Sequence, residues 1–130
     1  MSPMKEVAKT ILIVDDEPDV LAYLSALLED HGFSTCTAKD GREAESALTS
    51  ITPDLITLDI TMPQKSGAWF YRRIREHSEW GNIPVIIITG VESSQESFVV
   101  MYPHLRPPEG FLSKPIDHAA ILQLVAELVA

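Results

Sequence analysis

Four short apolar runs along the chain each lead into charged or hydroxyl-bearing side chains, and this pattern limits the possible folds more than any other feature. The runs cover residues 11–14, 55–58, 85–88 and 111–112. The polar residues that follow them are, in the same order, Asp15-Asp16-Glu17, Asp59, Thr89 and Lys114. Continuous apolar runs of this length are typical of strands buried in a parallel sheet. Because parallel strands point the same way, these polar side chains are expected to meet at one edge of the sheet.

Segments with helical features separate the runs. Pro18 follows the first acidic cluster and suits the first turn of a helix, which Gly32 is expected to end. The other expected elements are a strand over 33–37, a helix after Asp40-Gly41, a helix after a loop over 64–67, a short helix ending near residue 102, a strand over 111–113 and a helix from Asp117. Alternating strands and helices predict an α/β fold with a mostly parallel sheet.

The composition indicates a single domain that works inside the cell. A chain of 130 residues with 45% hydrophobic and 22% charged residues is ordinary for one globular domain. The net charge of −9 opposes direct binding to nucleic acid and to anionic membranes. The single cysteine excludes an internal disulfide, and no apolar run approaches the ~18 residues that span a membrane. The chain is therefore predicted to be cytoplasmic, with a flexible N-terminus over 1–9 and a folded domain over 10–130.

The residues at the expected sheet edge have the chemistry of a metal-assisted phosphoryl-transfer site. Asp15, Asp16 and Asp59 would lie close together, where like charges repel unless a cation sits among them. Oxygen ligands without a nearby histidine or cysteine favour magnesium over zinc. A carboxylate can also act as a nucleophile toward phosphorus, while Lys114 and the Thr89 hydroxyl can contact phosphoryl oxygens. No general base for repeated hydrolysis is evident, so a conventional enzyme is not expected.

These residues, in this order, resemble the receiver domain of response regulators in two-component signalling. The resemblance covers nearly all of the chain and rests on residues near the ends of four expected strands. They are Asp15-Asp16 after the first strand, Asp59 with Met62-Pro63 and Gly67 at the third, Thr89 at the fourth, and Phe111 with Lys114-Pro115 at the fifth. The resemblance implies a single five-stranded parallel sheet in the flavodoxin-like order 2-1-3-4-5, with helices on both faces.

The resemblance also implies roles at the site. Asp59 would accept a phosphoryl group from the phosphohistidine of a sensor histidine kinase or a phosphotransfer protein. Asp16, Asp59 and the backbone carbonyl of Thr61 would bind Mg²⁺ directly, and Asp15 mainly through water. Lys114 would contact the phosphoryl group.

A conformational switch is part of the same resemblance. Thr89 and Phe111 would move together on phosphorylation and change a surface that binds a downstream protein. The Lys114-Pro115 peptide bond would be cis. One segment departs from the family pattern: residues 91–110 are interrupted by prolines, begin just after Gly90 where alanine is usual, and lack the usual Gly-Ala turn. Because family members commonly use this region for output, a second interpretation is a docking module of the same fold that works without phosphorylation.

Two further interpretations use related chemistry or topology. A phosphohydrolase with an aspartyl-phosphate intermediate usually has a second acid two residues after the nucleophile, where this chain has Thr61. A flavodoxin-like cofactor binder has a hydroxyl-rich phosphate loop after its first strand, where Asp15-Asp16-Glu17 would repel a phosphate. Both fit the sequence less well than a receiver domain does.

Several other side chains are expected to be structural or solvated. Arg72, Arg73 and Arg75 are expected mostly on the outer face of the third helix. Trp69 precedes the inward-facing Phe70 and is expected to be partly exposed. The four histidines show no spacing typical of metal ligands, and Cys36 is expected to pack in a strand.

Overall fold

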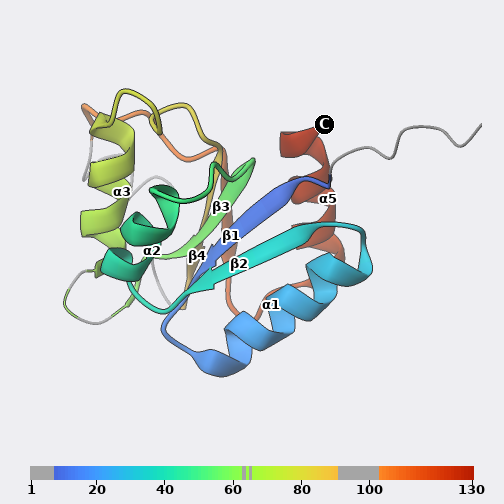
Figure 1. Ribbon diagram of the computed structural model, residues 1–130. Helices are drawn as coiled ribbons and strands as arrows, with labels where there is room; N and C mark the ends of the chain where they lie inside the picture. The colour runs from blue at the N-terminus through green and yellow to red at the C-terminus, as the bar shows by residue number, and fades with distance from the viewer. Residues whose placement is uncertain (1–7, 63, 65, 91–102) are drawn as a thin grey trace, which may run out of the picture.

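The computed structural model describes residues 8–62, 64, 66–90 and 103–130, and its strands form one five-stranded sheet (Figure 1). The strands in chain order are β1 (Thr10–Val14), β2 (Ser34–Ala38), β3 (Leu55–Asp59), β4 (Val85–Thr89) and β5 (Gly110–Ser113). Their order across the sheet is β2-β1-β3-β4-β5, and every neighbouring pair is parallel. The predicted fold class and strand order are confirmed.

Helices cover both faces of the sheet. They are α1 (Pro18–Asp30), α2 (Gly41–Leu48), α3 (Ser66–Glu76) and α5 (His118–Val129). Helices α1 and α5 pack on one face, and α2 and α3 pack on the other (Figure 1). The short helix predicted to end near residue 102 and the first seven residues of the predicted flexible N-terminus lie outside the described residues. No helix in the described part of the chain is long and apolar enough to cross a membrane.

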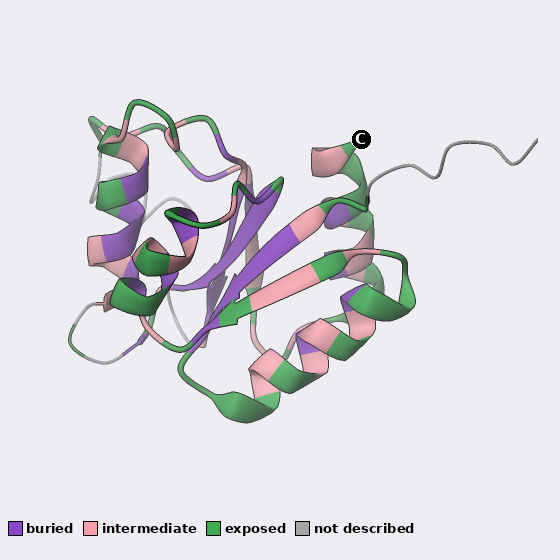
Figure 2. Cartoon of the chain, viewed as in Figure 1, coloured by how far each residue is buried: buried purple, intermediate pink, exposed green. Residues whose placement is uncertain are grey.

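Each strand residue faces one of two cores, because side chains alternate across a strand. Ile11 and Ile13 pack with α1 and α5, whereas Leu12 and Val14 pack with α2 and α3. Every residue of β3 and β4 is buried, which explains their nearly continuous apolar sequences (Figure 2). Thr57, in the middle of β3, is polar although it is buried, and its hydroxyl has no hydrogen-bond partner among the described residues.

The helix ends follow signals in the sequence. Helix α1 begins at Pro18 and stops before Gly32, whose φ of 88° is a left-handed conformation that glycine adopts easily. Asp40 and Asp117 cap α2 and α5. Their carboxylates accept hydrogen bonds from backbone N–H groups three residues further on, at 2.8 and 3.1 Å.

Three elements differ slightly from their predicted ranges, and one of them, β5, begins one residue earlier than the predicted range 111–113. Strand β2 starts and ends one residue later than the predicted range 33–37. Helix α3 begins at Ser66, inside the predicted loop 64–67, because its first turn is held against its neighbours. The Ser66 hydroxyl oxygen accepts a hydrogen bond from the backbone N–H of Gly41 at 2.5 Å. Gly67 packs so closely on β3 that an added Cβ would lie 2.5 Å from the carbonyl oxygen of Asp59.

The expectation that Arg75 lies on the outer face of α3 is wrong. Its side chain is 0% exposed, and its guanidinium pairs with the carboxylate of Glu109 at 2.7 Å. The same guanidinium donates to the Tyr71 hydroxyl and to four backbone carbonyls, those of Gly81, Ile83, Arg106 and Pro107. These contacts hold residues 81–83, which precede β4, and residues 106–109, which precede β5, against the last turn of α3. The other two arginines, Arg72 and Arg73, are exposed as predicted.

Candidate functional site

The candidate site lies at the carboxyl edge of the sheet, where the neighbouring strands β1, β3, β4 and β5 all end. Backbone hydrogen bonds continue past the strand ends: the N–H of Asp15 donates to Ala38 at 3.1 Å, and the N–H of Lys114 donates to Thr89 at 2.8 Å. These bonds fix the first residue beyond each strand. The fold therefore brings Asp15, Asp59 and Lys114 together from three separate parts of the chain.

Four carboxylates form a tight cluster at this edge. One oxygen from each of Asp15, Asp16, Glu17 and Asp59 lies within 4.8 Å of the others. Asp15 and Asp59 are buried, with exposures of 1% and 2%, whereas Asp16 and Glu17 are exposed. The predicted meeting of the first acidic run with Asp59 is therefore seen in the structure.

Lys114 supplies the positive charge that faces this cluster. Its Nζ lies 3.1 Å from Asp15 Oδ2, 2.7 Å from Glu17 Oε1 and 3.3 Å from Asp59 Oδ2. Partial burial acts to lower the pKa of Lys114, but the hydrogen bonds to Glu17 and Asp15 and the charge of Asp59 outweigh it and raise the pKa well above its usual range. Lys114 is therefore firmly cationic.

The charged form of Asp15 is less well stabilised than that of Lys114. Burial raises the pKa of Asp15, and the charge of Asp59 adds to the increase. A hydrogen bond from the Glu17 backbone N–H at 2.9 Å and the contact with Lys114 act in the opposite direction without cancelling the shift. The site thus holds more negative charge than its one lysine stabilises.

Thr61 orients the carboxylate of Asp59. Its backbone N–H and its hydroxyl both donate to Asp59 Oδ1, at 2.9 and 2.7 Å. Asp59 Oδ2 is left facing Lys114. The resemblance implied a metal-binding role for the Thr61 carbonyl but not this contact with Asp59, so the side-chain contact is an addition. Glu17 is a second addition: its place in the acidic run 15–17 was the available signal, but its contact with Lys114 spans 97 positions.

Thr89 and Phe111 lie on the neighbouring strands β4 and β5, as expected. Thr89 is 1% exposed, and its hydroxyl has no hydrogen-bond partner in the part of the chain that the structure describes. Phe111 is half-buried and packs against the core beneath α2 and α3. The Lys114-Pro115 bond is cis, which confirms the prediction.

The residues present suit a hard divalent cation. All the clustered ligand atoms are carboxylate oxygens, the donor type that Mg²⁺ prefers. Two of these carboxylates are buried, and one lysine alone compensates the group. Burial is the main cause of the raised pKa of Asp15, and a divalent cation among the carboxylates would relieve the repulsion from Asp59 that adds to it.

A doubly covered parallel sheet with an acidic cluster and a lysine at its carboxyl edge is the architecture of receiver-type signalling domains. The chain belongs to the response regulator receiver domain family, which it matches over residues 11–126. It is a signalling domain and not a conventional enzyme.

Individual relatives agree with this assignment. Protein Rrf1 of Nitratidesulfovibrio vulgaris is 31% identical over 120 residues, which cover 92% of this chain and 82% of that protein. The receiver domain of a signal transduction histidine kinase from Syntrophus aciditrophicus is 30% identical, with a TM-score of 0.82 over 94% of this chain and 90% of that chain. Chemotaxis protein CheY4 of Vibrio cholerae is 27% identical, with a TM-score of 0.83 over 94% of this chain and 99% of that chain.

Proposed function

We propose that this protein is a phosphorylation-controlled switch that accepts a phosphoryl group on Asp59. The observation that carries the proposal is the position of Lys114, whose Nζ lies 3.3 Å from a buried carboxylate oxygen of Asp59. Asp59 is held by Thr61 on its other oxygen, so its orientation is fixed before a phosphoryl donor arrives. A positioned nucleophile beside a fixed cation suits phosphoryl transfer, which depends mainly on positioning and charge stabilisation.

In the transfer step, a carboxylate oxygen of Asp59 attacks the phosphorus of a phosphohistidine. The new P–O bond forms while the P–N bond breaks, and the histidine leaves as a neutral imidazole when its other ring nitrogen carries a proton. Lys114 can hold the phosphoryl oxygens as a point charge. The donor would be a sensor histidine kinase or a phosphotransfer protein, and the similar Syntrophus domain is itself described as part of a histidine kinase.

The proposed metal is magnesium, held by Asp15, Asp16, Asp59 and the backbone carbonyl of Thr61. Bound magnesium would neutralise charge on the transferred phosphoryl group. The protein's own residues set up this step: the sheet edge fixes the carboxylates, and Thr61 holds Asp59 Oδ1.

Thr89 and Phe111 are the proposed switch residues. A phosphoryl group on Asp59 would offer the buried Thr89 hydroxyl an acceptor that it lacks among the described residues. That contact would favour the conformation in which Thr89 moves toward the site, and Phe111 on the neighbouring strand would turn inward into the space released. The changed surface would bind a downstream protein. We place this receiver unit over residues 10–130 and assign it to the cytoplasm.

The test is phosphorylation by acetyl phosphate with Mg²⁺, read by intact mass. The native protein is expected to gain one phosphoryl group, and Asp59→Asn none. Chelation of Mg²⁺ is expected to abolish the adduct, and Lys114→Met to slow its formation by roughly 10²-fold. Thr57→Val is the matched control for Thr89→Val, because both remove a buried hydroxyl without a described partner. Only Thr89→Val should weaken the movement of Phe111 on phosphorylation, followed by the NMR signals of its ring. A native protein that gains no adduct would instead be a docking module that works without phosphorylation.

A further inference from the structure

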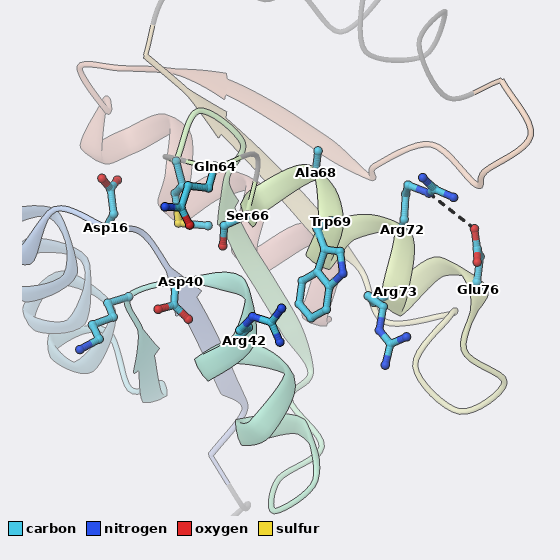
Figure 3. Close-up of a pocket in the computed structure, with 12 residues that line it drawn as sticks. Asp16, Asp40, Arg42, Gln64, Ser66, Ala68, Trp69, Arg72, Arg73 and Glu76 are labelled. Atoms are coloured by element: carbon cyan, nitrogen blue, oxygen red, sulfur yellow. Dashed lines mark ion pairs between the residues drawn. The ribbon is translucent and has the colours of Figure 1, made fainter.

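A groove beside the proposed phosphorylation site gathers positive charge that the switch does not use. It has a volume of about 920 Å³ and extends from Asp16, at the carboxylate cluster, to Glu76 at the end of α3 (Figure 3). Its positively charged lining residues are Lys39, Arg42, Arg72 and Arg73. These are four of the ten lysines and arginines in a chain whose net charge is −9. Three acids, Asp16, Asp40 and Glu76, also line the groove, so its lining carries a small excess of positive charge in an otherwise acidic protein.

This positive charge is only partly neutralised within the protein. Arg42 forms no ion pair with any residue that the structure describes. Arg72 lies 3.8 Å from Glu76, and both side chains are more than half exposed, at 58% and 56%, so the pair is weak. Arg73 is held more closely, by Glu45 at 2.6 Å. Arg42 is thus available to bind an incoming carboxylate, and Arg72 can exchange its weak, exposed pair with Glu76 for one.

Other carboxylates in the groove are engaged elsewhere. Asp40 caps α2 by accepting a hydrogen bond from the Glu43 N–H at 2.8 Å. Asp16 belongs to the carboxylate cluster at the sheet edge. Neither acid forms an ion pair with Arg42, Arg72 or Arg73 in the described part of the chain.

Trp69 places an aromatic ring between the guanidinium groups. The Cζ atoms of Arg42 and Arg73 lie 5.3 and 5.5 Å from its ring centroid. Figure 3 shows the indole with Arg42 on one side and Arg73 on the other. Trp69 is half-buried, which confirms the predicted partial exposure, and its inner part packs on the core beneath α2 and α3. Tryptophan and arginine are the residue types most enriched where protein–protein binding energy concentrates.

We propose that this groove docks an acidic segment of a partner protein. Carboxylates of the segment would bind the guanidinium groups of Arg42 and Arg72, and an apolar side chain next to them would pack on Trp69. Planar guanidinium groups match carboxylates in two-point contacts, which gives both affinity and register. Docking at this groove needs no phosphoryl transfer, so the inference stands apart from the proposed switch.

A nucleic acid fits the groove less well than an acidic protein segment. A nucleic acid is a long, uniform polyanion, and its backbone would extend over Asp16 at one end of the groove and Glu76 at the other. The net charge of −9 opposes every anionic ligand, and it acts on more charges of an extended nucleic acid than of a short peptide segment. A short peptide segment can confine its carboxylates to the part of the groove around Trp69.

The experiment uses Trp69 as the reporter. The chain has two tryptophans, so Trp80→Phe leaves Trp69 as the only one and keeps an aromatic ring beside His77. The probe is a short synthetic peptide that combines glutamates with leucine and phenylalanine, and the control peptide has glutamine at each glutamate. Titration of the fluorescence of Trp69 is expected to give saturable binding of the acidic peptide and binding about tenfold weaker, or ~1.4 kcal/mol, for the control.

Two variants with the same change in charge separate local contact from overall attraction. Arg42→Gln removes a guanidinium that has no described ion pair, and is expected to weaken binding of the acidic peptide by about tenfold. Lys9→Gln changes an exposed residue just before β1, at the end of the sheet where the strands begin and away from the groove. It is expected to change binding by less than about twofold. If thermal denaturation shows that Arg42→Gln does not fold, Arg72→Gln takes its place.

Several results would overturn the proposal. They are the absence of a saturable change at Trp69, equal binding of the glutamine peptide, and an equal loss in Arg42→Gln and Lys9→Gln. A single-stranded oligothymidylate that binds more tightly than the peptide, and loses affinity in Arg42→Gln, would also overturn it and assign the groove to nucleic acid.

Discussion

Arg75→Met tests whether the buried guanidinium network holds the segments flanking β4 in place. The Arg75 side chain is 0% exposed and pairs with Glu109 at 2.7 Å. The Glu109 oxygen that accepts this bond also accepts one from the Val85 backbone N–H at 2.7 Å, directly at the start of β4. Methionine has a similar aliphatic length but donates no hydrogen bond, so the Glu109 carboxylate would lose one of its donors and several backbone carbonyls would lose the guanidinium.

The size of the effect follows from what remains after the change. Removing one partner of a buried ion pair destabilises a protein by about 3–5 kcal/mol. Here Glu109 keeps a second contact, with Arg106 at 2.9 Å, so its charge is not left alone. We therefore expect the lower limit, a loss of ~3 kcal/mol in the free energy of unfolding. For a domain of this size the melting temperature would fall by about 10 °C.

Urea unfolding followed by circular dichroism measures this loss. Glu76→Gln is the matched control, because it breaks the exposed 3.8 Å pair with Arg72 on the same helix and should change stability by less than ~0.5 kcal/mol. Arg75→Lys is expected to fall between the two, because an ammonium keeps the charge but lacks the planar fork. If Arg75→Met destabilises no more than Glu76→Gln, the network does not hold this part of the fold.

Three further substitutions test other parts of the structure. In the presence of EDTA at neutral pH, Asp15→Asn should raise the free energy of unfolding measured by urea titration. The reason is that burial and Asp59 raise the pKa of Asp15 and so penalise its ionised form. With added Mg²⁺, the native protein should instead be the more stable of the two. Thr57→Val should stabilise the protein by about 1 kcal/mol in thermal denaturation, and a lower melting temperature would show that the hydroxyl has a partner. Gly67→Ala should destabilise by about 1–3 kcal/mol, because its Cβ would lie 2.5 Å from the Asp59 carbonyl oxygen. Gly32→Ala is the control without a steric clash, because nothing lies within 4 Å of the new Cβ. Any destabilisation of this variant would come only from the backbone strain of its φ of 88°.

The sequence predicts the strands and the meeting of the charged residues well, because both depend on patterns local to each strand. A run buried on both faces can be recognised from its own residues, as in β4 (Val85–Thr89). Once the strands are parallel, the first polar residue after each must lie at the same edge, so Asp59 and Lys114 meet although they are 55 positions apart. The family pattern then supplied the strand order.

Contacts between distant side chains were not predictable in the same way. Arg75 follows Tyr71 by four positions and therefore shares its face of α3, which was the only local sign of burial. Its charge is compensated by Glu109, 34 positions away, and nothing near Arg75 in the sequence indicates that partner. The contact of Glu17 with Lys114 was missed for the same reason.

Arg75 and Lys114 show why the two kinds of basic residue occupy different places in this fold. Arg75 has its planar guanidinium surrounded by a hydroxyl, backbone carbonyls and Glu109, so every direction in which it can donate is already used. The Arg75 guanidinium is therefore fixed in one position. Lys114 has one ammonium shared among three carboxylates at 2.7 to 3.3 Å, and a point charge on a flexible stem can exchange partners without losing all of them. A cation or a phosphoryl group that entered the cluster, as we propose, would change which acceptor Lys114 prefers. A lysine therefore suits a site whose charge changes in the proposed switch, whereas an arginine suits the part of the fold that stays fixed.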